Sequence, residues 1–350
     1  MKSILFSYYP LYVPYSHSCA LLTAICRQEG INADYEPLWP GWFEKMLDYD
    51  IAGFSFITNA EYELSKPYMK AAKKLGKTVL VGGVYARMGA YIDPALVDIV
   101  CRGEAEPITD YIKHSDLSIF QVPHYQASID GLPMPDLSHV AGYEFHRGYK
   151  FLQGKKIIPY QSSRGCGYGK CSFCMVKFQP KKIRMKHTIA EDLTYLSDLY
   201  HPDLFYLAEE LPPYFNKEWR DQWEDIYFPF HCYIRADIKP DHLEWMIGHG
   251  LKVAAFGIET GSEKLRNNGL NKGLTDDQIM TTVDILRKNG LNYAPFYMAN
   301  LPGENAQDRE DTQRMIREVG GYPAVWEYQN LSKFTGVADD NSASHSGGHS

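Results

Sequence analysis

The sequence predicts an α/β protein with two parallel sheets: a doubly wound, Rossmann-like sheet at the N-terminus, followed by a partial (β/α)6 barrel. Short apolar runs alternate with helical segments over residues 1–128, and the alternation starts again after the proline-rich stretch "IDGLPMPDLS" at 129–138. Continuous apolar strands separated by helices are typical of parallel sheets that are covered on both faces.

The first half contains five apolar segments that we expect to be strands, namely 3–9, 32–38, 51–57, 78–84 and 97–103. Helices are expected at 18–30, which ends at Gly30, and at 62–76. In a sheet of this kind ligands bind at the carboxyl ends of the strands. A ligand of the first half is therefore expected at that edge.

The second half contains six expected strands, namely 156–163, 203–210, 230–237, 251–261, 291–304 and 322–331. Helices are expected at 188–200 and at 275–290, where Thr275 and Gln278 form a capping box. In β/α barrels chemistry takes place at the C-terminal strand ends. Polar residues follow those ends repeatedly: three cysteines, Glu209, Glu210, Arg235, Glu259 and Asn300.

These patterns divide the 350 residues into a Rossmann-like domain at 1–128, a linker at 129–150, a barrel at 151–334 and a tail at 335–350. The tail is small, polar and rich in Gly and Ser, which predicts disorder.

The composition excludes several classes of protein. The net charge of -7 favours neither nucleic acid nor an anionic membrane, although 177–187 is locally basic. The sequence contains no run of 18 apolar residues, so no membrane-spanning helix is expected. Seven cysteines without an export signal indicate a reducing cytoplasm and no disulfide framework.

Cys166, Cys171 and Cys174 are spaced C-x4-C-x2-C. Three thiolates so close together suit a single metal centre, because such a loop cannot easily form unstrained internal disulfides. One interpretation is structural zinc with His187 or His201 as a fourth ligand, and another is buried inert thiols. A third is a [4Fe–4S] cluster with three protein ligands and one open iron.

The stretch "RGCGYGKCSFC" (164–174) resembles the cluster loop of the radical S-adenosylmethionine (SAM) superfamily. The usual loop is C-x3-C-x2-C with an aromatic residue before the last cysteine; Phe173 fills that place, and one extra residue separates the first two cysteines. The first half resembles the cobalamin-binding domain that precedes this barrel in one large class. Six stretches match that class in order and spacing. Three lie ahead of the barrel, namely "VLVGGVYA" (79–86), "VCRGEAE" (100–106) and "LPMPD" (132–136), and three lie within it, namely "FGIETGSEKL" (256–265), "NKGLTDDQI" (271–279) and "LPGE" (301–304).

The resemblance implies that the three cysteines ligate a [4Fe–4S] cluster whose fourth iron binds SAM. Phe173 and Glu259 would lie at the SAM site, Glu259 on the ribose or amino group. Either Glu209 or Glu210 would meet the SAM amino group, since adjacent strand residues point in opposite directions. Arg235 would meet the carboxylate of SAM or form a structural salt bridge.

For the first half, the resemblance implies cobalamin contacts from four residues: Gly82, Gly83, Gly103 and Glu104. The alternative is that they only form a tight turn after a strand. No histidine ligand to cobalt is expected, because the D-x-H-x-x-G motif is absent and His17 stands alone in that region.

The function implied is a cobalamin-dependent radical SAM enzyme that methylates an unactivated carbon of a natural product, peptide or metabolite. Alternatives are a rearrangement or cyclisation enzyme, with or without bound cobalamin, and a zinc-stabilised binding module without catalysis. Implied partners are the small-molecule or peptide substrate and an electron donor such as flavodoxin or ferredoxin. A capping partner is also expected, because little sequence follows the sixth strand.

Overall fold

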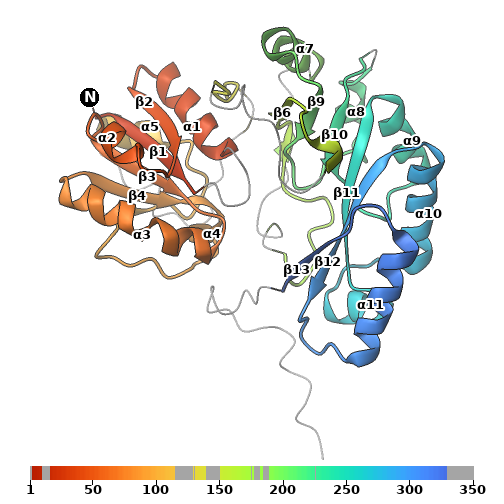
Figure 1. Cartoon of the computed structure of the whole chain (residues 1–350). Coiled ribbons are helices and arrows are strands. Elements are labelled where there is room, and N and C mark those ends of the chain that lie inside the picture. The colour runs from red at the N-terminus through yellow and green to blue at the C-terminus, as the bar shows by residue number, and fades with distance from the viewer. Residues whose placement is uncertain are drawn as a thin grey trace, which may run out of the picture. The chain divides into compact units, whose positions relative to one another are not determined.

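The computed structural model describes residues 2–9, 16–114, 129, 131–138, 150–174, 176, 182–183, 189–224 and 226–328. These residues form two compact units, one within 1–147 and one within 148–330 (Figure 1). The predicted tail at 335–350 and part of the predicted linker at 129–150 lie outside the described residues.

The first unit is built on a parallel five-stranded sheet with the order β2-β1-β3-β4-β5, which confirms the five predicted strands. The strands are β1 (Ile4–Tyr8), β2 (Ala33–Pro37), β3 (Ile51–Ser55), β4 (Thr78–Gly82) and β5 (Ile99–Val100). The helices are α1 (His17–Gln28), α2 (Trp42–Met46), α3 (Asn59–Lys74), α4 (Gly83–Arg87) and α5 (Ile108–His114).

Two apolar clusters cover the two faces of this sheet. Residues of α1 and α5 form one cluster with Ile4, Phe6 and Ile51 of the strands. Residues of α2, α3 and α4 form the other with Leu5 and Phe54. Since successive strand residues point to opposite faces, both faces are buried and the sheet is doubly wound, as predicted.

The α3 helix begins earlier than the sequence pattern predicted. Thr58 accepts a hydrogen bond from the N–H of Glu61, and the Glu61 carboxylate accepts from the N–H of Thr58. This capping box satisfies N–H groups at the helix start, and it places that start at Asn59 rather than at residue 62. The short helices α4 and α5 were not predicted.

The part of the predicted linker at 131–138 packs on the first unit, whereas residue 150 belongs to the second. The carbonyl of Asp136 accepts a 2.6 Å hydrogen bond from Tyr35, and its carboxylate pairs with Arg27. Leu137 beside it is 1% exposed. These residues therefore serve as structure of the first unit.

The second unit is built on a parallel six-stranded sheet with the order β13-β12-β11-β10-β9-β6, which confirms the six predicted strands. The strands are β6 (Ile157–Tyr160), β9 (Leu204–Leu207), β10 (Phe230–Tyr233), β11 (Leu251–Glu259), β12 (Asn292–Ala299) and β13 (Ala324–Glu327). The two end strands, β6 and β13, do not pair with each other within the described ranges, as in a partial barrel.

Helices follow the strands of this unit along its outer side (Figure 1). They are α7 (Ile189–Tyr200), α8 (Lys217–Asp221), α9 (Pro240–Gly248), α10 (Asp276–Lys288) and α11 (Ala306–Val319). Two short turns, η1 (Lys150–Leu152) and the π-helical η3 (Leu265–Gly269), and a small antiparallel pair, β7 (Ser163–Arg164) with β8 (Lys182–Ile183), complete the unit. The capping box of Thr275 and Gln278 at α10 is confirmed.

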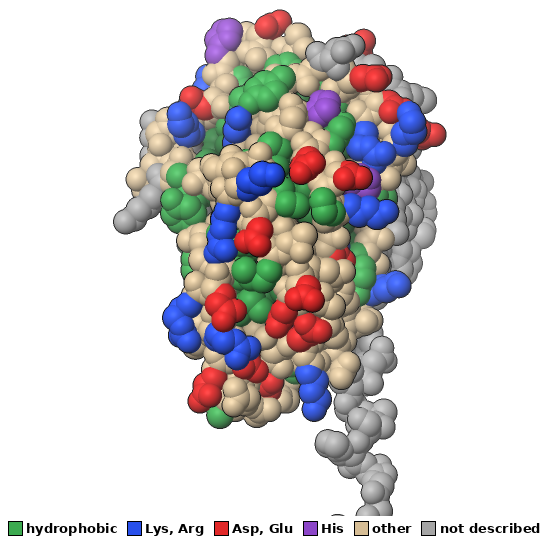
Figure 2. Space-filling model, turned by 90° about the vertical axis from the view of Figure 1, so that its right-hand side faces the viewer, with side chains coloured by type: hydrophobic (Ala, Val, Ile, Leu, Met, Phe, Trp, Pro, Cys, Tyr) green, Lys and Arg blue, Asp and Glu red, His purple; other side chains and the backbone are tan. Residues whose placement is uncertain are grey.

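The outer helical side carries both signs of charge side by side (Figure 2). Arg314 pairs with Asp311 and Glu318 on α11, and Arg287 pairs with Asp284 on α10. Such mixed charge is typical of a solvated helical face. Among the described helices none is long and apolar enough to cross a membrane.

The close packing of α11 on the end of β11 yields a stability prediction. A Cβ on Gly261 would lie 2.2 Å from the carbonyl oxygen of Asp311, so Gly261→Ala must push the helix away. We expect it to lower the free energy of unfolding by about 1–3 kcal/mol in urea titrations followed by tryptophan fluorescence. Gly248→Ala is the control, because a Cβ there meets nothing within 4 Å and should be neutral or slightly stabilising.

Candidate functional site

The loop with the three cysteines starts at the carboxyl end of β6. The pairing of β7 with β8 closes its base, with Ser163 opposite Ile183. The N–H of Gly165 donates a 3.0 Å hydrogen bond to the carboxylate of Glu210, just beyond β9. Gly165 has a φ of 83°, in the left-handed region that favours glycine. The end of the neighbouring strand therefore anchors the beginning of the loop.

The far side of the cysteine loop is docked on the segment that follows β11, about a hundred residues along the chain. The N–H of Ser172 donates to the carbonyl of Leu270 at 3.0 Å. The side chain of Asn271 donates to the carbonyl of Lys170, and the Tyr168 hydroxyl donates to the carbonyl of Asn271, both at 2.9 Å. The bonds run in both directions, so each segment holds the other.

One buried arginine fixes this supporting segment. Arg266 is 0% exposed, and its guanidinium donates to the carbonyls of Thr260 and Leu274 at 2.9–3.0 Å. It also pairs with Asp276 at 2.9 Å. A buried guanidinium is tolerated only when its donors are satisfied. Arg266 thus ties the end of β11, η3 and the start of α10 into one support for the cysteine loop.

The three thiols are free, Cys171 buried and Cys166 and Cys174 half-buried. Burial raises the pKa of Cys171 and Cys174, and Lys272 opposes that rise. Within the described part of the chain, no three side chains of His, Cys, Asp or Glu lie close enough together to hold a metal ion.

The donor chemistry of this loop nevertheless fits an iron–sulfur cluster with three protein ligands. Three thiols on nine consecutive residues supply soft ligands, and ligation would require them to be deprotonated. Of the two histidines considered for a zinc site, His187 lies outside the described residues and His201 is exposed at the end of α7.

A buried ion pair lies beside the thiols. Lys272 Nζ is 2.6 Å from Glu259 Oε1, and the two side chains are 11% and 8% exposed. Glu259 has a φ of 74°, which strains a residue other than glycine. A Cβ on Gly257 would lie 2.0 Å from the Glu259 oxygen, so a side chain there would displace the ion pair from its present position. Burial, the largest single influence, lowers the pKa of Lys272, but the charge and hydrogen bond of Glu259 together with Cys171 raise it overall.

Arg235 lies at the same edge and is already paired. Its guanidinium donates to both carboxylate oxygens of Asp237, at 2.9 and 2.8 Å, and to the carbonyl of Lys272 at 2.9 Å. It also stacks on the ring of Tyr168 at 3.7 Å. This arrangement is the structural salt bridge named as the alternative role, and through Tyr168 it braces the cysteine loop.

Glu209 and Glu210 are directed to different surroundings. Glu209 is 1% exposed, and its Oε1 accepts hydrogen bonds from the N–H and hydroxyl of Ser162, both at 2.6 Å. Trp219 donates to the same hydroxyl at 2.8 Å, on the side covered by α8. Glu210, which accepts from Gly165, is therefore the one that faces the cysteine loop.

Residues 160–316 match the sequence model of the Radical SAM superfamily. The chain carries a radical SAM domain. This match confirms the resemblance seen in the cysteine loop, and it spans all of the contacts just described.

Two curated relatives are similar to the chain beyond this domain. The anaerobic magnesium-protoporphyrin IX monomethyl ester cyclase of Rubrivivax gelatinosus is 22% identical over 80% of this chain and 56% of that protein. The bacteriochlorophyllide d C-8(2)-methyltransferase of Chlorobaculum tepidum is 22% identical over 77% of this chain and 63% of that protein. The chain thus spans less than two thirds of either relative.

The fold is also similar to that of TsrM, a radical SAM methyltransferase from Kitasatospora setae. Its structure with tryptophan substrate and a SAM analogue bound has a TM-score of 0.71 at 12% identity, covering 93% of this chain and 73% of TsrM. Its structure with cobalamin and a [4Fe–4S] cluster has the same TM-score and identity, covering 93% and 75%. At this identity the similarity concerns the fold.

Ahead of the radical SAM domain, the four residues predicted to contact cobalamin lie at the carboxyl end of β4, where Gly82 is the last strand residue and Gly83 begins α4, and just after β5. Gly83 has a φ of 85°, and a Cβ there would lie 2.6 Å from the carbonyl oxygen of Phe56. The close approach of α4 to the end of β3 therefore requires this glycine. Gly82 has no such constraint, since its Cβ would meet Cys101 at an ordinary 3.7 Å. Gly103 and buried Glu104 follow β5.

Sequence reasoning missed Arg266, Lys272 and Tyr168, which hold the site of the radical SAM domain together. Lys272 lies in "NKGLT" (271–275), whose resemblance to a family motif was the one signal that could have pointed to it. Asn300 follows β12 with a φ of 61° and donates to Glu327 at 3.3 Å. Lys272 Nζ lies over the ring of Phe173, 5.8 Å from the centre of that ring.

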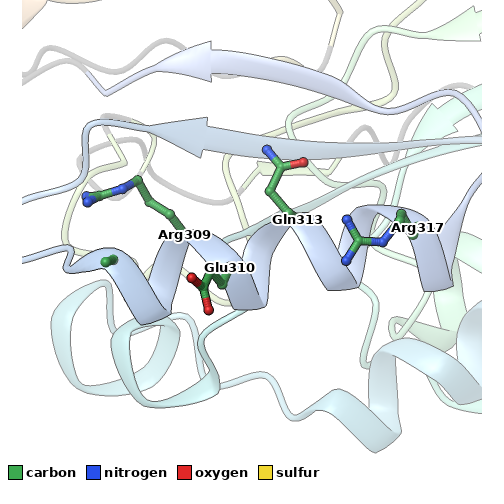
Figure 3. Close-up of a pocket in the computed structure, with 5 residues that line it drawn as sticks. Arg309, Glu310, Gln313 and Arg317 are labelled. Carbon is green, nitrogen blue, oxygen red and sulfur yellow. The ribbon is translucent and has the colours of Figure 1, made fainter.

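A groove elsewhere in the radical SAM domain runs along α11 (Figure 3). Arg309, Glu310, Gln313 and Arg317, all from this one helix, line it. It shares no residue with the cysteine loop or with the Glu259–Lys272 pair, and its charges are of both signs.

The buried carboxyl of Glu209 predicts a pH-dependent stability. Burial raises its pKa to about 7, although the hydrogen bonds from Ser162 oppose this. The folded state thus binds this proton more tightly than the unfolded chain, whose glutamates titrate near 4.5. The stabilisation is complete below pH 4.5 and is lost as the pH rises through 7.

Glu209→Gln remains neutral, so its stability relative to the wild type should rise by roughly 3 kcal/mol from about pH 4.5 to 8. Urea titrations at several pH values measure this difference. Glu244→Gln, at an exposed position on α9, is the control. A difference for Glu209→Gln that stays constant with pH would contradict the assignment.

Proposed function

We propose that the chain is a cobalamin-dependent radical SAM enzyme that methylates an unactivated carbon of a small molecule or peptide. The observation that carries the proposal is the loop of Cys166, Cys171 and Cys174, held at the strand ends of a radical SAM domain by Glu210 and the segment after β11. Ordinary acid–base side chains cannot abstract hydrogen from such a carbon, so cofactor chemistry is required.

In this proposal the three cysteines hold a [4Fe–4S] cluster. Glu210, rather than Glu209, is the carboxylate at the end of β9 for the SAM amino group, because Glu209 is directed into the core. Glu259 contacts the ribose or amino group of SAM from the end of β11, beside Phe173. Bound together, cluster and SAM supply a radical that abstracts hydrogen, and cobalamin supplies methyl transfer.

Arg235 acts in this proposal mainly by position. Its guanidinium is committed to Asp237 and stacked on Tyr168, so it fixes the orientation of the cysteine loop. The carboxylate of SAM would then reach this guanidinium through Nη1, because Nε and Nη2 already donate to Asp237 and to the carbonyl of Lys272.

The first unit supports a cobalamin site by its strand order. In a sheet with the order 2-1-3-4-5, the strands after β1 are added first on one side and then on the other, so the order switches between β1 and β3. Ligands of such sheets bind in the crevice at the carboxyl ends of those two strands. TsrM, whose fold covers 93% of this chain, was solved with cobalamin bound. We propose contacts from Gly82, Gly83, Gly103 and Glu104, and no histidine on cobalt.

A second candidate reaction is cyclisation or rearrangement with the same site. It is favoured by the similarity to the Rubrivivax gelatinosus cyclase, which covers 80% of this chain. The mass of the product separates the two: a gain of one methylene unit supports methylation, and an unchanged or hydrogen-depleted mass supports the alternative. An electron donor such as flavodoxin or ferredoxin is part of either proposal.

The experiment is purification without oxygen from cells supplied with cobalamin. The wild type should hold about four iron and four sulfide per chain, show corrin absorption bands, and cleave SAM when reduced with dithionite. Single Cys→Ala substitutions at 166, 171 and 174 should each abolish SAM cleavage and most of the iron.

Cys19→Ala is the matched control. Burial raises the pKa of the Cys19 thiol to about 12, so it is an inert thiol of the first unit, and the variant should keep full iron content. Zinc without iron or sulfide in the wild type would overturn the proposal in favour of a zinc-stabilised module. Iron without corrin bands would overturn only its cobalamin part.

A further inference from the structure

The Lys272 side chain has no role in the function proposed above, although it contacts the cysteine loop at Phe173. It is nearly completely buried, lies over the ring of Phe173 and pairs with Glu259. A lysine seldom occupies such a place, because burial of an ammonium group costs free energy unless the charge is used or paired.

The ammonium group of Lys272 lies beside the cysteine loop. Its Nζ is 5.8 Å from the ring centre of Phe173, the residue just before Cys174. The carbonyl of Lys272 accepts a hydrogen bond from Arg235, which stacks on Tyr168 of the same loop. The sign of the Lys272 charge is the one that favours negative charge on sulfur.

The position of Lys272 is rigid. Its N–H donates to the carbonyl of Arg266 at 3.0 Å, and its own carbonyl accepts from Arg235 at 2.9 Å. The absence of a side chain on Gly257 leaves the space in which the ion pair lies. Arg266 is itself fully buried, so the backbone that carries Lys272 is fixed by the same contacts that support the cysteine loop.

We propose that Lys272 is a positioning residue that sets the reduction potential of the cluster held by Cys166, Cys171 and Cys174, with Glu259 moderating its charge. The inference rests on the proposed iron–sulfur function. Reduction adds one electron, from an external one-electron donor, and no proton. A fixed ammonium group beside the thiolates stabilises that extra negative charge, while a nearby carboxylate opposes it.

The test is a redox titration of anaerobically purified protein, with and without the substitutions, followed by the EPR signal of the reduced cluster. Lys272→Met should shift the midpoint potential to more negative values, and Lys272→Arg should leave it near that of the wild type. Glu259→Gln should shift it to more positive values. Shifts of opposite sign are expected only from charge, since a loosened structure would not reverse its effect with the sign of the group removed.

Lys264→Met is the matched control, because it removes a lysine that is exposed just before η3. It should not move the potential. If Lys272→Met loses its iron, the shift of Glu259→Gln decides: a positive shift supports the proposal, and no shift overturns it. Unchanged potentials in variants that keep their iron, or shifts of both variants in one direction, also overturn it.

The failure of this inference differs from failure of the proposed function. A wild type that binds no iron–sulfur cluster would overturn both. A wild type that binds the cluster and cleaves SAM, with potentials that do not respond to Lys272 or Glu259, would overturn only the role of Lys272.

Discussion

The hydrogen bonds of the buried Arg266 guanidinium are the constraint on which the rest of the site depends. Thr260, Leu274 and Asp276 satisfy its donors, and this closes the segment after β11 into a firm platform. The cysteine loop has little regular structure, so the precision of its thiols must come from that platform. Stabilisation of the loop is thus supplied by a part of the chain without any cysteine.

The same site holds each of its buried cations in an ion pair. Lys272 pairs with Glu259, Arg235 with Asp237 and Arg266 with Asp276, all at the edge where β10 and β11 end. Opposite charges can remain in a protein interior when they satisfy each other. Their fields are weakly screened there, so nearby thiols experience them more strongly than they would in water.

In the first unit, the candidate ligand edge of the sheet is shaped by close packing of backbone segments. At Gly83 the turn from β4 into α4 passes so near to Phe56 that a side chain is excluded. The glycine is thus explained by packing within the unit, and the strand order of its sheet, rather than that glycine, is the feature that directs a ligand to the carboxyl edge.

Both parallel sheets, the number of their strands and the cysteine loop could be predicted from the sequence, because periodicity, caps and cysteine spacing are local signals. The start of α3 was missed, since the Thr58–Glu61 capping box lies just ahead of the apolar pattern. The folded structure was needed to establish that Glu210 faces the loop and that Lys272 pairs with Glu259. The first is a contact between residues 45 apart in the chain, and the second depends on the left-handed backbone at Glu259, so no local pattern encodes them. Arg235 and Asp237 are only two residues apart, but the stacking of this arginine on Tyr168 brings together distant parts of the chain.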